Sequence, residues 1–205
     1  HKKITEFNIP LKAYISASAV GFYGAVTSKN VMTELDAPAT DFLGQTCVAW
    51  ESVAQRYAES GIRTVVLRTG VVLAAQGGAL SKMMMPVKWG LGAALGSGRQ
   101  FMPWIHIDDL CKLYIFALEH ESLRGIYNAT APQHCTNAEL TKQLATVLHR
   151  PFWPVNVPSF VLKLMYGQMA DMLLKGSAVS SEKIMKEGFQ FAIPKLEMAL
   201  FDVIR

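Results

Sequence analysis

The sequence predicts an α/β fold with a parallel sheet, followed by a small, mostly helical C-terminal domain. The run "KAYISASAV" at 12–20 is short and apolar with β-branched residues, as strands are. The unbroken Val/Leu run in "RTVVLRTGVVLA" at 63–74 suits a parallel strand covered on both faces. Strand-like and helix-like segments alternate up to Arg150-Pro151, which is typical of parallel sheets with crossover helices. Because prolines become frequent after that point, we predict one domain over residues 1–152 and a second over 153–205.

A polar loop over 25–41 separates the first strand from a helix that we expect between Asp41 and Ser60. Gly61 follows the helix as a candidate C′ residue, the position where a left-handed glycine commonly ends a helix. The helix carries an apolar stripe at helical spacing, formed by Leu43, Cys47, Trp50, Ala54 and Tyr57. This stripe predicts the face that packs on the sheet.

The next segments continue the alternation. We expect a helix over 79–91, a glycine-rich loop over 90–100, and a short strand over 101–107. Asp108 is the predicted N-cap of the helix that follows, and "GIYNATA" is the next strand. Thr136 and Glu139 form a capping-box pattern at the start of another helix.

The last segment reads as helical. An apolar helix is expected over 159–175, ending at Gly176, and a shorter helix ends near Gly188. Pro194 predicts the first residue of a final helix, because proline suits the N1 position.

Composition excludes several function classes. The 20 basic residues are scattered and the net charge is only +4, whereas a nucleic-acid surface needs a clustered basic stripe. Cys47, Cys111 and Cys135 lie far apart, which predicts neither a disulfide framework nor a metal site and fits a reducing, cytoplasmic location. No apolar stretch reaches the roughly 18 residues that suggest a membrane span. We therefore expect no nucleic-acid or membrane partner.

The stretch "ISASAVGFYG" at 15–24 places hydroxyl side chains and glycines where a strand ends. Parallel sheets bind ligands at the carboxyl ends of their strands, so Ser16, Ala17 and Ser18 are candidates for contact with a ligand. The alternative is that these residues only form the turn that ends the strand.

Several blocks resemble the extended short-chain dehydrogenase/reductase superfamily in the right order. They are "ISASAVGFYG", "LRTGVVL" at 67–73, "GSGRQFMPWIHIDDL" at 96–110 and "GIYNATA". The "WE" at 50–51 and "GVVLAAQGGALSKM" at 70–83 resemble one atypical branch, the YfcH-type, sugar-nucleotide-epimerase-like proteins. The last 50 or so residues resemble the C-terminal domain of unknown function in that branch.

The resemblance implies a Rossmann-like, doubly wound sheet of which this chain holds the C-terminal portion, with the N-terminal half missing. It implies NADP or NAD as cofactor, with a binding site incomplete in this chain. No GxGxxG-type turn opens a helix here, and "GLGAALGSG" follows a helix, which is the wrong context for that fingerprint. Thr69, Gly70 and Val71 resemble the stretch whose backbone touches the nicotinamide.

Enzymes of the superfamily use a Ser or Thr together with a Tyr and a Lys four residues apart on one helix. Ser18 matches the serine, but Leu43 and Cys47 stand where the Tyr and Lys are expected. No Tyr-x-x-x-Lys occurs anywhere in the chain. Proton transfer by the usual pair is therefore in doubt.

Other side chains are candidates for the site. Tyr23 is a candidate proton donor, with packing beneath the loop as the alternative. His106 is a candidate acid, base or substrate contact, or a structural residue. Arg99 precedes "FMPWIH", where related extended enzymes place an arginine on the phosphate of a nucleotide sugar, and the resemblance therefore implies that role unless Arg99 is only a surface residue. A guanidinium group suits phosphate by its planar pair of donors. Arg68 is expected either to pair with a carboxylate or to face the substrate.

Two hypotheses follow. In the first, the protein is an NAD(P)-dependent epimerase, dehydratase or reductase that acts on a sugar nucleotide or another small hydroxyl or carbonyl compound, through Ser18 and Tyr23. In the second, it binds NADPH without turnover, as a sensor or assembly module. A homodimer is possible in either case.

Overall fold

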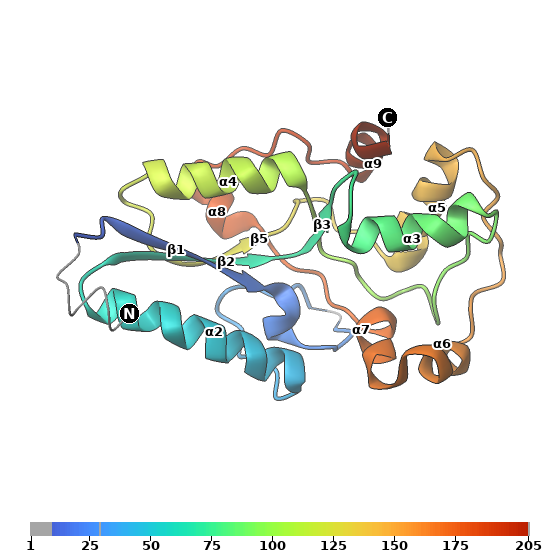
Figure 1. The fold of residues 1–205 in the computed structure, drawn as a ribbon, viewed down its shortest axis with the longest axis horizontal. Helices are drawn as coiled ribbons and strands as arrows, with labels where there is room; N and C mark the ends of the chain where they lie inside the picture. Colours follow the sequence, from blue (N-terminus) through green and yellow to red (C-terminus); the bar gives the residue numbers. More distant parts are fainter. Residues whose placement is uncertain (1–9, 29, 205) are drawn as a thin grey trace.

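The computed structural model describes residues 10–28 and 30–204. Its main sheet has the order β1-β2-β5, formed by β1 (Ala13–Ala19), β2 (Arg63–Thr69) and β5 (Gly125–Ala129), and both pairings are parallel. Helices α2 (Phe42–Glu59) and α4 (Ile107–Glu119) lie on opposite faces of this sheet (Figure 1). The predicted α/β class with a parallel sheet is confirmed.

The run 63–74 is not one strand. It breaks at Gly70, and β3 (Val71–Leu73) pairs in parallel with β4 (Trp104–His106) in a second, two-stranded sheet. The backbone of Gly70 passes so close to the next segment that a Cβ there would lie 2.7 Å from the carbonyl oxygen of Pro103. This close approach lets the chain cross from one sheet to the other immediately after β2.

Helix α2 begins and ends as predicted. The carboxylate of Asp41 accepts a hydrogen bond from the N–H of Gly44, and Gly61 has a φ of +80° after the C-cap. The predicted stripe is only partly correct, because Trp50 is 54% exposed. The helix packs over β1 and β2, and β1 is an edge strand of the described sheet, so less of the helix surface is covered than the periodicity suggests.

The middle segments form α3 (Gly78–Lys88), α4 and α5 (Asn137–Val147), and the capping box of Thr136 and Glu139 is present. Helix α4 starts earlier than predicted. Its N-cap is His106, whose Nδ1 accepts a hydrogen bond from the N–H of Asp108 at 3.2 Å.

The C-terminal segment contains α6 (Ser159–Tyr166), the 3₁₀ turn η2 (Gly167–Met169), α7 (Ala170–Leu174), α8 (Glu182–Lys186) and α9 (Leu196–Ile204). The prediction of one continuous helix over 159–175 is wrong. The chain turns at Gly167, which has a φ of +57°, a conformation that ends a helix. Helix α9 begins two residues after the proline predicted to open it.

Of the three apolar clusters among the described residues, the two larger are the cores that hold these parts together. One lies between the sheet and α4, and includes Ile184 and Phe189 from the C-terminal segment. The other gathers α3, α5 and α9 around Trp104, with Leu196 and Leu200 contributed by α9. The C-terminal segment therefore completes both cores, and the division at residue 152 stays a prediction. Within the described residues, no helix combines the length and the apolar character that crossing a membrane requires.

Candidate functional site

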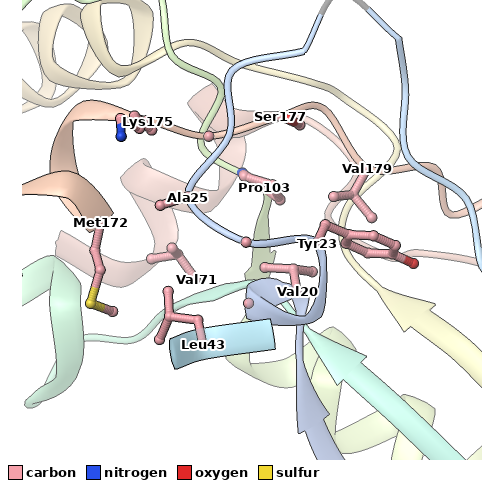
Figure 2. Close-up of a pocket in the computed structure, with 13 residues that line it drawn as sticks. Val20, Tyr23, Ala25, Leu43, Val71, Pro103, Met172, Lys175, Ser177 and Val179 are labelled. Atoms are coloured by element: carbon pink, nitrogen blue, oxygen red, sulfur yellow. The ribbon is translucent and has the colours of Figure 1, made fainter. Parts of the chain in front are cut away.

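A pocket of about 180 Å³ opens where β1 ends (Figure 2). The turn η1 (Val20–Tyr23) forms one side, and Leu43 of α2 lies at its base. Val71, at the start of β3, contributes a further wall. The pocket thus lies at the carboxyl ends of parallel strands, where such sheets bind ligands.

The C-terminal segment closes the pocket from the opposite side. Met172 and Lys175 line it, and Figure 2 shows both side chains on the same side of the opening. Ser177 fixes this segment against the loop after η1, because its hydroxyl donates to the carbonyl of Val26 and accepts from the N–H of Ser28. The pocket is therefore built jointly by the sheet and the C-terminal segment.

A buried ion pair lies beneath the pocket. Arg68, only 2% exposed, donates from Nε and Nη2 to the two carboxylate oxygens of Glu51, each at 2.8 Å. The hydroxyl of Ser18, a residue that is 4% exposed, donates to the same carboxylate at 2.7 Å. The two parallel hydrogen bonds between a guanidinium and a carboxylate fix the relative orientation of both groups.

The network continues to Tyr23. Its hydroxyl donates to Oδ1 of Asn128 at 2.7 Å and accepts from Nη1 of Arg68 at 3.1 Å. Burial raises the pKa of Tyr23, and this effect outweighs the nearby Arg68 cation, which acts in the opposite direction. The tyrosine ring lines the pocket, while its hydroxyl points away from the pocket centre in Figure 2.

Arg68 is held on all sides. Its guanidinium also stacks on the ring of Phe22, 3.3 Å from the ring centroid. Burial alone would lower the pKa of Arg68, but the hydrogen bonds to Glu51 and Tyr23 outweigh it and the pKa is raised. Arg68 pairs with a carboxylate, which is one of its two expected roles, and its guanidinium is enclosed by these groups. The expected contact of Arg68 with a substrate stays a prediction.

Leu43 and Cys47 lie on the helix face expected for the Tyr and Lys of the superfamily. A Cβ placed on Gly21 would meet Cβ of Leu43 at 3.5 Å and Sγ of Cys47 at 3.7 Å, so both side chains face the turn after β1. Burial raises the pKa of the Cys47 thiol, whose Sγ lies 3.6 Å from the carbonyl oxygen of Ala19. A neutral, buried thiol supports the structural interpretation of this cysteine.

The residues predicted to touch a cofactor differ in whether they reach the pocket. Val71 lines the pocket, whereas Gly70 is enclosed between neighbouring segments and Ser18 points into the buried ion pair. Ser16 is half-buried, and Ala17 is exposed on β1 without lining the pocket. Thr69 directs its hydroxyl to the carbonyl of Leu67 at 3.4 Å.

Arg99 and His106 lie outside the pocket. Arg99 is exposed, and its backbone N–H is held by Ser97 in the glycine-rich loop. His106 is buried, caps α4, and places Nε2 3.3 Å from Oδ2 of Asp202 in α9. Nε2 makes no well-aligned hydrogen bond to Asp202. The cap on α4 and the proximity to α9 both fit the structural interpretation of His106.

Sequence reasoning missed the residues that join the site together. Glu51 supports only the resemblance to the family in the sequence-based predictions, although its spacing of eight residues from Leu43 places it on the same face of α2. Asn128 carried one available signal, an amide side chain at the buried end of a strand. Met172 and Lys175 carried none, because only the folding of the C-terminal segment brings them to β1.

Comparison with known proteins agrees with this geometry. Residues 5–130 match the NAD dependent epimerase/dehydratase family, and residues 157–203 match a domain of unknown function. The mouse (Mus musculus) epimerase family protein SDR39U1 is 40% identical over 204 residues, which cover 99% of this chain and 69% of the relative.

Two solved structures are also similar. The crystal structure of human epimerase family protein SDR39U1 with NADPH has a TM-score of 0.90 and 34% identity, over 99% of this chain and 68% of that one. A nucleoside-diphosphate sugar epimerase from Corynebacterium glutamicum has a TM-score of 0.77 and 27% identity, over 94% and 37%. On the sequence match, the fold and the placement of the site, this chain belongs to the NAD dependent epimerase/dehydratase family.

Proposed function

We propose that this protein binds NADPH and acts on a small hydroxyl or carbonyl compound, such as a sugar nucleotide, held in the pocket at the end of β1. The observation that carries the proposal is the pocket itself, which lies at the carboxyl edge of a parallel sheet and is lined by Val20, Leu43 and Val71. The NADPH in the human relative supports the choice of cofactor. Because the chain spans about two thirds of that relative, the whole protein's activity is part of the proposal.

The described residues fit the nicotinamide end of such a cofactor. The side chain of Val20 and the backbone of Gly21 line the pocket at the turn after β1 and suit a flat ring, which leaves Leu43 and Val71 to the substrate. This chain contains no GxGxxG-type turn that opens a helix, so the proposal concerns the nicotinamide end of the cofactor and the substrate. When bound, the cofactor supplies or accepts the hydride.

Tyr23 is the proposed proton donor. Its ring lines the pocket, and proton donation requires the hydroxyl to leave Asn128 and turn toward the pocket. Arg68 lies 3.1 Å from this hydroxyl, where a cation stabilises the tyrosinate left after proton transfer. Arg68 thereby takes over the electrostatic part of the absent lysine. Ser18 and Glu51 are proposed as positioning residues, because Glu51 holds Arg68, Ser18 holds Glu51, and neither lines the pocket.

A second candidate is binding of NADPH without turnover. It is favoured by the hydroxyl groups of Ser18 and Tyr23, which are both engaged inside the fold. The raised pKa of Tyr23, caused mainly by burial, also opposes formation of a tyrosinate.

In the test, the full-length gene product is mixed with NADPH and with each member of a panel of carbonyl compounds and nucleotide sugars, and the absorbance of NADPH is followed over time. We expect turnover that falls about a hundredfold in Tyr23→Phe, while NADPH affinity is unchanged, because the variant removes the proton donor but keeps the ring that lines the pocket. Tyr14→Phe is the control, since Tyr14 stacks on Tyr57 away from the pocket. Tight binding without turnover would establish the second candidate, and absence of NADPH binding would refute both.

A further inference from the structure

The pocket offers few free polar groups. Tyr23, Lys175 and Ser177 are the polar side chains among the described residues that line it. The hydroxyl of Tyr23 is engaged by Asn128 and Arg68, and that of Ser177 by the loop over 26–28. Two of the three groups are therefore used by the fold itself.

The backbone of the walls is also largely engaged. The N–H of Gly24 donates to the carbonyl of Gly21, and the N–H of Val71 donates to the carbonyl of Pro103. The N–H of Gly176 points to Oγ1 of Thr27 at 3.4 Å. A ligand gains few hydrogen bonds from these walls.

Lys175 differs from the other polar groups. Its side chain is 46% exposed, and its Nζ lies 3.0 Å from Oδ2 of Asp171, one turn earlier in an equally exposed position. Exposed pairs at this spacing shift an equilibrium only about twofold. A ligand anion can therefore recruit the ammonium group at little cost.

This arrangement does not suit a buried sugar ring. A hexose carries hydroxyl groups on most carbons, and each one left without a partner in a closed site costs about an order of magnitude in affinity. The pocket, at about 180 Å³, is also smaller than the roughly 300–1,000 Å³ typical of sites for drug-sized ligands. Its walls are instead mostly apolar, and they include the side chains of Leu43, Val71 and Met172.

We propose that the pocket binds a compact, carbon-rich carboxylic acid, with its apolar body against Leu43, Val71 and Met172 and its carboxylate at Nζ of Lys175. This proposal deepens the proposed function, because it names the substrate class of the same pocket, and rests on it. It selects a carbonyl acid over a sugar nucleotide. Lys175 acts here as a binding residue that sets specificity.

The test is calorimetric titration of the cofactor-free, full-length gene product. The probes are 4-methyl-2-oxopentanoate, its uncharged methyl ester, and UDP-glucose. We expect the acid to bind at least tenfold more tightly than the ester, and UDP-glucose neither to bind the pocket nor to displace the acid. Because the cofactor is absent, acid binding is measured even if the NADPH proposal fails.

Variants locate the binding. Lys175→Met keeps the aliphatic stem and is expected to weaken acid binding about tenfold while leaving the ester unchanged. Lys186→Met is the matched control, because Lys186 also forms an exposed pair one turn from its partner, Glu182, but does not line the pocket.

A second pair tests the apolar wall without altering charge. Leu43→Trp fills the pocket and should abolish acid binding, whereas Phe42→Trp, at a neighbouring exposed position, should not. Unchanged acid affinity in Lys175→Met, tighter binding of UDP-glucose than of the acid, or no binding of the acid at all would each overturn the proposal.

Discussion

Replacing Glu51 by methionine tests the buried network beneath the pocket. Three hydrogen bonds end on this carboxylate, two from Arg68 and one from Ser18. Glu51→Met leaves the Arg68 cation, 2% exposed, without its counter-charge. Breaking a buried pair from one side costs about 3–5 kcal/mol, because the remaining charge stays desolvated.

For a protein of this size, each 1 kcal/mol corresponds to about 2–4 °C in Tm, so we expect Tm to fall by about 6–20 °C. The assay is urea unfolding followed by far-UV circular dichroism, with calorimetry for Tm. Glu59→Met is the control, since Glu59 is an exposed residue on the same helix. It should change the free energy of unfolding by less than about 0.5 kcal/mol.

The double variant Glu51→Met/Arg68→Met separates a coupled pair from two independent side chains. Removing both charges takes away the uncompensated cation, so the double variant should be more stable than Glu51→Met alone. The reasoning is refuted if Glu51→Met behaves like Glu59→Met, or if the losses of the two single variants simply add.

Three further predictions concern other parts of the fold. Asp109→Ala removes the carboxylate that accepts from the N–H groups of Ala192 and Ile193. The free energy of unfolding in urea should fall by about 2–6 kcal/mol, and amide exchange at Ile193 should become faster. The control is Asp108→Ala, at an exposed residue, which should lower the free energy of unfolding by about 1 kcal/mol or less. Burial raises the pKa of Cys135 from 9.0 to about 12, so the thiol loses its proton at lower pH in the unfolded chain than in the folded protein. The contribution of this thiol to stability is therefore complete below about pH 9 and falls as pH rises toward 12. Unfolding measured across that range should show a flatter fall in Cys135→Ala, by up to about 1.4 kcal/mol per pH unit. In Gly176→Ala the new Cβ would overlap the carbonyl oxygen of Phe101, so the variant should lose acid binding at the pocket and unfold at a lower temperature. In Gly78→Ala the new Cβ meets no neighbour, so acid binding at the pocket should change far less.

Local pattern was sufficient for most of the elements. The β-branched runs of β1 and β2, the cap at Asp41, the left-handed Gly61 and the capping box at Thr136 were all predictable, because each depends on residues close together in the chain. The errors lie where distant segments decide. His106 displaced Asp108 as N-cap, Gly70 divided a continuous apolar run because Pro103 passes beside it, and Gly167 interrupted the helix expected over 159–175.

Predictions about the site were less complete for the same reason. Ser18, Tyr23 and Arg68 were each selected individually, but their joining through Glu51 and Asn128 spans up to 105 residues of sequence separation. No local pattern encodes such a contact. Nor does any pattern near residue 175 indicate that this segment faces the end of β1.

By itself, the sequence determined the α/β class, the family, and the absence of a Tyr-x-x-x-Lys pair, because periodicity and motif order are properties of neighbouring residues. Only the tertiary structure decided which hydroxyl groups are engaged inside the fold and which cation, Lys175, stands at the pocket. Accessibility and charge pairing depend on what a side chain meets in space, and the partners of Ser18 and Tyr23 in this protein lie 33 and 105 residues away in the sequence.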